Sequence, residues 1–291
     1  MNIYIPFLAL LFGIFGTTSY HMAKALTKQG IDTFKRDAKG RKKKSAIWIV
    51  GFILNNIVTV FQVIALLFGP GSLYTSMFGS GMIVLLFYAH YVLKERITYR
   101  ELIGAVLIII GTLAIGIISI FFQNESPIII YDKFFYSLYF IAPISITMIF
   151  IGFKFKKYTI IAYASCGGMI SAIGSDFMYV GNVGGGFQPY PFILIVVYIV
   201  GLLLGTASFL LSQFAWARDA DVSKYVPIHN TFNFLTPFIY EFIIFIVIWN
   251  DFLGFLFKLP FIIITLVGLY LIVNVLVKTM KKPKPKEENK N

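Results

Sequence analysis

The sequence predicts an all-α polytopic membrane protein with nine transmembrane helices, from its composition, the length of its apolar runs and the placement of its basic residues. Hydrophobic residues make up 58% of the chain and charged residues 13%, about half of the roughly 25% that a soluble domain carries. The apolar residues form separate runs, each close to the ~20 residues that a helix needs to cross ~30 Å of hydrocarbon. None of the runs alternates apolar and polar residues with a period of two, so a β-barrel is excluded. The runs lie at 4–25, 47–68, 72–92, 102–121, 134–153, 158–180, 192–214, 226–248 and 259–277.

Basic residues set the predicted orientation of these helices. With the segment 26–46 placed inside, all 25 Lys and Arg residues except Lys133 and Lys258 fall in inside segments. The positive-inside rule needs far less bias than this to orient a membrane protein. One missed or extra span would reverse every later segment. The charges therefore support nine spans, with the N-terminus outside and the C-terminus inside.

The net charge of +12 follows from this topology and does not predict a nucleic-acid-binding groove. The basic loop 26–46 includes RDAKGRKKK at 36–44, which could also touch anionic lipid headgroups. The first run is expected to be a retained helix, because its basic residues follow the apolar stretch instead of preceding it. The tail 278–291 is basic and contains Pro, so we expect it to be disordered and inside.

Two stretches of the sequence are similar, although they open spans of opposite direction. GSLYTSMFGSG (71–81) opens the third span, and VSKYVPIHNTF (222–232) opens the eighth. Similarity between oppositely oriented segments is what an inverted repeat predicts. We therefore expect a first repeat of four helices at 1–121 and a second repeat of five helices at 134–277. The matched pairs are Ser72 with Ser223, Tyr74 with Tyr225, and Ser80 with Thr231.

The stretch VLKERITYRELIGAVLIIIGTLAIGI (92–117) resembles the drug/metabolite transporter superfamily, in which a short L-x-E-R/K loop leads into G-x-x-L-I-x-x-G. Within that superfamily the layout is most similar to the NIPA-type magnesium transporters, which also have nine spans and a basic loop after the first helix. FGPGSLYTSMFGSG is similar to their turn between the second and third helices, and SKYVPIHNTFNFLTPFIYEFI to their F-N-T-x-x-V-T-P-I-Y-Y segment. The superfamily residues are Leu93, Glu95, Arg96, Gly104, Leu107, Ile108 and Gly111.

This resemblance covers most of the chain loosely, and it implies a carrier of two inverted repeats with Mg²⁺ as its substrate. Two features depart from the family pattern. The second span reads FILNNIVTV and has no acid where family members carry Gly-Glu-x-x-Asn, and the lysine often found in their sixth span is missing, with Asp176 in that neighbourhood. The substrate must therefore be argued from the residues of the site.

Two acids lie inside apolar spans. Asp176 interrupts MISAIGSDFMYVG in the sixth span, and Glu241 lies at a similar depth in the eighth. A charged side chain in hydrocarbon is costly, so an intramembrane acid usually faces the bundle interior or a water-filled cavity. We expect the two carboxylates to line one cavity and to bind a metal ion. The alternative for Asp176 is interfacial water at the mouth of its helix.

Polar stripes on the eighth and second spans point to the same cavity. On the eighth span the amides, Pro237 and the acid fall within an arc of about 80°, and we expect Pro237 to act as a hinge. The alternative for the amides on both spans is hydrogen bonding to neighbouring helices as part of the packing. Tyr74 is a further candidate, because it belongs to the repeated segment. The predicted substrate-binding residues are Asp176, Glu241, Asn230, Asn233, Asn55, Asn56, Gln62 and Tyr74.

Three other polar residues lie at predicted span ends. His21 and Lys24 end the first span, and His229 begins the eighth. We interpret the histidines as interfacial and Lys24 as a side chain that snorkels to the membrane surface. The one cysteine, Cys166, lies within a span, which excludes an intrachain disulfide and a Cys-based metal cluster.

These features predict a multi-pass protein of the cell membrane that moves a cation such as Mg²⁺ by alternating access. Two carboxylates with Asn and Ser oxygens could hold a partly hydrated Mg²⁺ ion through its waters. The same residues suit a small organic solute such as an amino acid, an amine or a drug. A non-transporting receptor or scaffold is a third alternative.

An enzyme is not expected, because the three His are well separated and no HExxH, GxSxG or P-loop motif occurs. The expected partners are the lipid bilayer, a small cationic or polar solute and, as an open alternative, a second copy of the chain. No nucleic acid is expected as a partner. No cofactor is expected either, since Mg²⁺ would be the transported substrate.

Overall fold

In the computed structural model, all regular secondary structure in the described part of the chain is helical. This confirms the all-α part of the predicted fold class. Every predicted apolar run coincides with helix there, except that the run 72–92 is broken at Met77 and the end of the run 226–248 lies outside the described residues. The first part of the basic stretch 36–44 and the tail beyond Lys281 also lie outside them. The structure describes the backbone of residues 4–34, 40–68, 71–122, 131–155, 158–183, 191–244 and 252–281.

Several of these helices have the length and composition of membrane spans. Within the described residues, five are long and apolar enough to cross a membrane (α2, α5, α7, α8 and α11), and α4 and part of α6 are shorter apolar helices. These helices support a membrane-embedded protein. The elements are α1 (Tyr4–Gly30), η1 (Ile31–Phe34, a 3₁₀ turn), α2 (Arg41–Phe68), α3 (Gly71–Ser76), α4 (Phe78–Tyr91), α5 (Tyr99–Phe122), α6 (Tyr131–Lys154), α7 (Thr159–Val183), α8 (Pro191–Ala217), α9 (Val222–Ile244) and α11 (Phe252–Lys281).

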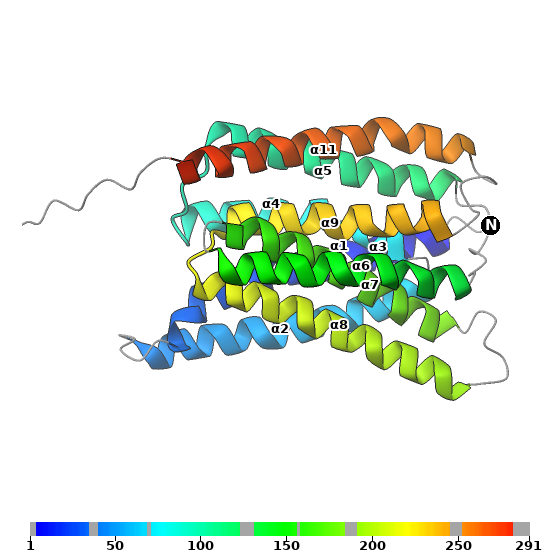
Figure 1. Cartoon of the computed structure of the whole chain (residues 1–291), viewed down its shortest axis with the longest axis horizontal. Helices are drawn as coiled ribbons and strands as arrows, with labels where there is room; N and C mark the ends of the chain where they lie inside the picture. The colour runs from blue at the N-terminus through cyan, green and yellow to red at the C-terminus, as the bar shows by residue number, and fades with distance from the viewer. Residues whose placement is uncertain are drawn as a thin grey trace, which may run out of the picture.

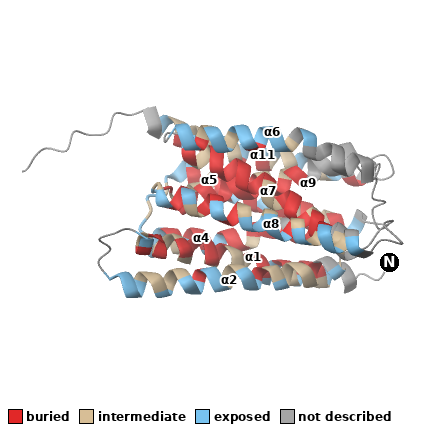
Figure 2. Cartoon of the chain, turned by 60° about the horizontal axis from the view of Figure 1, so that its bottom comes forward, coloured by how far each residue is buried: buried red, intermediate tan, exposed pale blue. Residues whose placement is uncertain are grey.

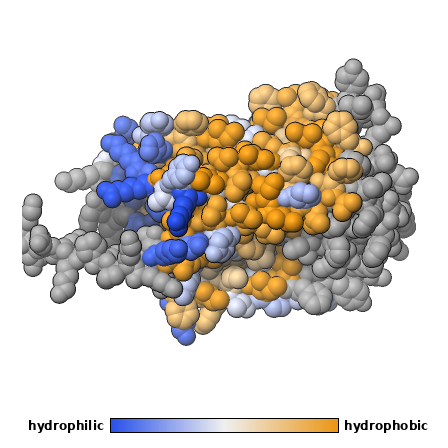
Figure 3. Space-filling view, turned by 90° about the horizontal axis from the view of Figure 1, so that it is seen from above, coloured by the Kyte–Doolittle hydropathy of each residue, from blue (hydrophilic) through white to orange (hydrophobic). Residues whose placement is uncertain are grey.

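The long helices lie side by side and alternate in direction along the long axis of the molecule (Figure 1). The connections that follow α1, α4 and α8 lie at one end, which also holds the end of α11. We call this the basic end, because it carries Lys94, Arg96 and Arg218. The space-filling view shows hydrophilic residues gathered at this end, beside a broad apolar belt (Figure 3). A belt of this kind on the outer surface is suited to lipid.

Buried and exposed apolar residues are divided between the inside and outside of the bundle (Figure 2). On α2, Ile53 and Val60 are more than half exposed. The interior is a continuous cluster to which α1, α4, α5, α7, α8, α9 and α11 contribute, with Leu85, Ile108 and Ile272 fully buried in it. The core therefore lies between α5, α7 and α9, and α2 forms part of its outer wall.

Two helix pairs cross at glycines. A Cβ atom added to Gly104 of α5 would lie 2.7 Å from the carbonyl oxygen of Gly268 of α11, and one added to Gly268 would lie 2.5 Å from that of Gly104. Gly174 of α7 and Gly201 of α8 approach each other in the same reciprocal way, at 2.9 and 2.7 Å. Small residues let transmembrane helices pack backbone against backbone. Any side chain at these four positions would force the paired helices apart.

The third predicted span, 72–92, is not one continuous helix. It is interrupted at Met77, between α3 and α4, by a tight turn in which the Ser80 N–H donates to the Met77 carbonyl. The hydroxyls of Ser80 and of Thr17 on α1 also donate to that carbonyl, at 2.8 and 3.0 Å. Hydroxyl side chains that bond backbone carbonyls compete with regular helix, which accounts for the break.

The loop between α4 and α5 reaches across to the start of α9. The Glu95 carboxylate in this loop accepts hydrogen bonds from the backbone N–H groups of Val222 and Ser223, each at 2.8 Å. These are the first residues of α9, whose N–H groups have no partner inside the helix and whose dipole favours a negative charge. This contact, the Glu95 cap, joins the segment 1–121 to the segment 134–277 at the basic end.

Candidate functional site

One face of α1 carries polar side chains into the bundle interior. Thr17, Tyr20, His21 and Lys24 follow the i, i+3, i+4, i+7 spacing of a single helix face. The exposed fractions of Thr17, His21 and Lys24 are 0%, 0% and 1%. Lys24 lies inside the helix and not at its end, because α1 continues to Gly30. The interpretation of His21 and Lys24 as interfacial side chains is therefore wrong.

Lys24 is held by uncharged groups. Its Nζ donates to Ser212 Oγ on α8 at 2.9 Å, and Ser212 in turn donates to the Phe209 carbonyl. The rings of Tyr20 and Phe209 lie 5.0 and 5.7 Å from Nζ, which are cation–π distances. The ion pairs formed in the described part of the chain involve other lysines, Lys44 and Lys224. A buried ammonium here would lack a countercharge.

His21 fixes the orientation of the Asn230 amide on α9. His21 Nδ1 lies 2.5 Å from the carbonyl oxygen of Thr17. A carbonyl oxygen only accepts, so Nδ1 carries the ring proton and Nε2 of the neutral ring is an acceptor. Nε2 lies 2.6 Å from Asn230 Nδ2, which donates to it. The Asn230 carbonyl oxygen is then left over, buried and without a hydrogen-bond partner among the described residues.

His229 is fixed in the same way by its neighbours. Ser208 donates its single hydroxyl proton to the Gly167 carbonyl at 2.8 Å, so it accepts from His229 Nε2 at 3.1 Å. The Tyr20 hydroxyl lies 3.2 Å from the same nitrogen. In this tautomer His229 Nδ1 is an acceptor, and within hydrogen-bond geometry it has no partner in the part of the chain that the structure describes, although the neighbouring Asn230 side chain interacts with the ring. With an exposed fraction of 1%, His229 is not the interfacial residue that the sequence indicated.

Asn233 completes a row of buried acceptors on α9. Its Nδ2 lies 3.5 Å from Ser171 Oγ on α7, and its Oδ1 lacks a partner within the described ranges. His229, Asn230 and Asn233 fall within an arc of about 100° on one face of α9. Buried polar atoms are nearly always hydrogen-bonded, so three acceptors on one face that are unpaired among the described residues favour the binding of a group that supplies a donor. We call these three atoms the acceptor row.

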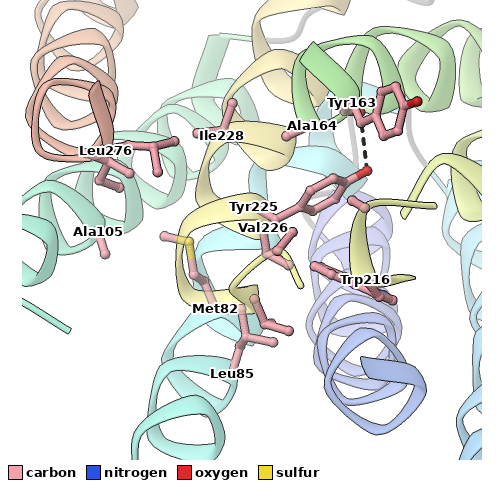
Figure 4. Close-up of a cluster of buried hydrophobic side chains, with 14 of the residues drawn as sticks. Met82, Leu85, Ala105, Tyr163, Ala164, Trp216, Tyr225, Val226, Ile228 and Leu276 are labelled. Carbon is pink, nitrogen blue, oxygen red and sulfur yellow. Dashed lines mark hydrogen bonds between the residues drawn. The ribbon is translucent and has the colours of Figure 1, made fainter. Parts of the chain in front are cut away.

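The six residues around this point form one site, the Lys24 cluster. Tyr20 links its two parts, because Tyr20 contacts the Lys24 ammonium with its ring and His229 with its hydroxyl. On the side toward the basic end, Trp216 and Tyr225 pack edge to face, with ring centroids 4.7 Å apart and both side chains fully buried (Figure 4). The members of the cluster are Tyr20, His21, Lys24, His229, Asn230 and Asn233.

Trp216 and Tyr225 separate the Lys24 cluster from the basic end. The Tyr225 hydroxyl donates to the Tyr163 carbonyl on α7 at 3.2 Å, as the dashed line in Figure 4 shows. Beyond this pair lies the Glu95 cap, which fixes the start of α9. The cluster is thus covered on this side by aromatic side chains and a charge-capped helix end.

The structure brings some of the predicted site residues together. Asn230 and Asn233 belong to the Lys24 cluster. Tyr74 is 2% exposed and packs against Phe78, whose ring also contacts Tyr20. Gln62 of α2 donates to Ser175 of α7 at 2.7 Å, one residue before Asp176.

The other predicted residues are not members of the Lys24 cluster, or have side chains that lie outside the described residues. Asn55 is half-buried, and Asn56 is exposed and donates to the Phe52 carbonyl of its own helix. Asp176 is half-buried. The α9 backbone continues as helix through Pro237 and Glu241, whose side chains lie outside the described residues.

The described residues do not gather metal ligands. Among them, no group of three or more His, Cys, Asp or Glu side chains is placed to hold a metal ion. Around Lys24 the available groups are an amine or ammonium, two neutral imidazoles, amides and hydroxyls. Such a set binds polar organic groups, and an anion best, since Lys24 offers the one charge.

Comparison with family models, with curated proteins and with solved structures gives no match to this chain.

Proposed function

We propose that this protein is a membrane carrier for a small organic solute that bears a carboxylate group and a neighbouring hydrogen-bond donor. The observation that carries this proposal is Lys24, which is buried in an apolar bundle and linked through Tyr20 to His229 in the acceptor row of α9. Intramembrane ionisable residues are rare and usually mark a substrate or ion pathway. A carboxylate would satisfy Lys24, and a hydroxyl or amine beside it would donate to the acceptor row.

Alternating access is supported by the way the helices pair. α1 packs along α2 as α7 packs along α8, α4 contacts α1 as α9 contacts α7, and α5 pairs with α11. The corresponding helices are α1 and α7, α2 and α8, α4 and α9, and α5 and α11. The two helices of each such pair run in opposite directions (Figure 1). We propose an inverted repeat that relates α1, α2, α4 and α5 to α7, α8, α9 and α11, with α6 as the additional helix of the second half. Lys24 and the acceptor row then lie in different halves and separate when the halves rock.

We rank Mg²⁺, the substrate that the family resemblance implied, second. Mg²⁺ requires oxygen ligands and gives up its own bound waters reluctantly, and the Lys24 cluster offers an amine, imidazoles, amides and a hydroxyl without a carboxylate. Asp176, one of the two carboxylates predicted to bind it, is not a member of the Lys24 cluster, and the side chain of the other, Glu241, lies outside the described residues. Magnesium transport stays a prediction of the sequence, and the same experiment decides between the two.

The test uses the purified protein in lipid vesicles. We expect uptake of at least one radiolabelled solute from a panel of lactate, glycerate, pyruvate and alanine, and loss of that uptake in Lys24→Met. Lys278→Met, which removes a lysine exposed on α11, is the matched control and should transport normally. Uptake of Mg²⁺ that survives Lys24→Met would favour the second candidate. Uptake of neither kind of probe would contradict a carrier and favour a receptor or scaffold.

A further inference from the structure

We propose that Lys24 is a proton-binding site that couples the solute to a proton, so that each carboxylate crosses the membrane together with one H⁺. This inference rests on the proposed carrier function and adds the driving ion to it. It starts from the charge balance around one buried amine.

An ammonium group at Lys24 is poorly compensated in the described structure. It makes one hydrogen bond, to Ser212, and contacts two aromatic rings. Moving an ammonium out of water costs far more than one hydroxyl and two rings return. The favoured state of the empty site is therefore a neutral amine, and the favoured state with a carboxylate beside it is the ammonium. Protonation and solute binding thus require each other.

The titratable groups that face Lys24 cannot replace the solute as its countercharge. On α1 these groups are Tyr20 and His21, and on α9 the group is His229. Both histidines are neutral by their hydrogen bonds, and protonating either would add a second positive charge. The elements α8 and α2 contribute the uncharged side chains of Ser212, Phe209, Gln213 and Trp48 around this point.

Acidic side chains at the basic end act on a different lysine. The charges of Glu95, Asp219 and Asp221 reach Lys28, one turn beyond Lys24, and Lys28 lies over the Trp216 ring on the far side of the aromatic pair. In the described part of the chain, Lys24 thus has cationic or neutral neighbours. A bound carboxylate is the one countercharge that the proposed transport cycle supplies.

The transport step balances in protons and charge. On the side to which the cluster is open, a solute carboxylate enters and one proton passes from water to the Lys24 amine, giving an ammonium–carboxylate pair. After the halves rock, the carboxylate and the proton leave together on the other side. The empty carrier returns with a neutral Lys24. For a monoanion such as lactate, no net charge crosses the membrane.

The experiment uses the full chain in vesicles with radiolabelled lactate. With the membrane potential held at zero by potassium and valinomycin, an interior one pH unit more alkaline should drive lactate toward tenfold accumulation. An imposed potential without a pH gradient should have no effect. Lys24→Met should lose the accumulation, and Lys278→Met should keep it.

A second measurement does not depend on transport by the variant. When lactate is added to the unbuffered protein in detergent, the wild-type protein should take up one proton per lactate bound, while Lys24→Met should take up none. Accumulation of lactate that follows the potential and ignores the pH gradient, or binding without proton uptake, would overturn the coupling and leave the carrier in place. Absence of uptake of every solute in the panel would instead overturn the proposed function.

Discussion

Two ionisable side chains, Glu95 and Lys24, link the first 121 residues of this molecule to its second half, and their surroundings differ. Glu95 at the basic end accepts two backbone N–H groups at 2.8 Å and lies at a helix N-terminus, where a negative charge is favoured. Lys24 in the bundle has one hydroxyl partner and two rings, and the acceptor row near it is unpaired in the described residues. The Glu95 contact joins the loop between α4 and α5 to α9, and the Lys24 contact joins α1 to α8.

This difference separates a structural contact from a binding site. The Glu95 cap is complete within the protein, so it holds the basic end together without further groups. The Lys24 cluster has donors and acceptors that do not satisfy one another, and an incomplete buried network is stabilised by whatever completes it. A change at Glu95 should therefore act first on stability, and a change in the Lys24 cluster should act first on transport.

The largest effect is expected from Lys24→Met, which should lower solute uptake at least about thirtyfold, in line with the roughly 2–5 kcal/mol lost when one partner of a buried charge pair is removed. Thermal stability of the empty protein should not fall, because methionine fills a similar volume without a group that needs a partner. Uptake and thermal unfolding are measured on the same preparations. A variant that unfolds more easily yet still transports would place Lys24 with the structural contacts.

The next largest effect is expected from Glu95→Ala, which leaves the first N–H groups of α9 without their partner. Loss of two charge-assisted hydrogen bonds at a half-buried site should destabilise the protein by about 2 kcal/mol. Thermal unfolding in detergent measures the change. Glu95→Gln retains one carbonyl acceptor and should lose roughly half as much. Equal stability of all three proteins would show that the cap contributes nothing to closing the basic end.

Asn233→Ala sharpens the comparison, because it removes one unpaired acceptor from the cluster. The KM for the solute should rise about tenfold, the equivalent of one hydrogen bond of roughly 1.4 kcal/mol. The melting temperature should change little, since Asn233 Oδ1 has no partner to lose within the described chain and Nδ2 loses only the long 3.5 Å contact with Ser171 Oγ. A fall in stability at constant KM would instead support the alternative that Asn233 only packs helices together.

The smallest effect is a pH dependence at Glu95. Burial raises the pKa of this carboxyl above its ordinary 4.5, and this outweighs the hydrogen bonds from Ser223 and Val222, which lower it. The folded protein thus holds the Glu95 proton to a higher pH than the unfolded chain does. The stability that Glu95 gives the folded protein through its raised pKa is fully present below about pH 4.5 and is lost as the pH rises through that raised pKa.

Glu95→Gln cannot titrate and provides the control. The difference in melting temperature between wild type and Glu95→Gln should shift against the wild type as the pH rises from about 4.5 toward neutrality. A shift in the other direction would mean that the two N–H groups, and not burial, decide the ionisation of Glu95.

The sequence predicted the helices well because run length and apolar composition act locally. Each of the apolar runs coincides with helix where it is described, and the alternating direction of the helices puts Lys94, Arg96 and Arg218 at one end. The break at Met77 was not predicted, because it depends on a hydroxyl from α1 that is distant in sequence.

The site was predicted only in part, since hydropathy alone ends a span at its first charge. That reading ended the first span at residue 25, while the structure continues α1 to Gly30 and gives Lys24 a partner 188 residues away. The spacing of Thr17, Tyr20, His21 and Lys24 on one helix face was the available signal. The polar stripe on the second span, which includes Asn56, was visible in the sequence, but the sequence did not reveal which face of α2 turns outward.

The most direct test of the central claim is calorimetric binding of lactate to the purified protein and to Lys24→Met, with propionate and propane-1,2-diol as matched ligands. Our account predicts that lactate binds the wild type best, that propionate binds more weakly because it lacks the hydroxyl, and that the diol and the variant give no heat of binding. Equal lactate binding by the wild type and Lys24→Met would contradict it.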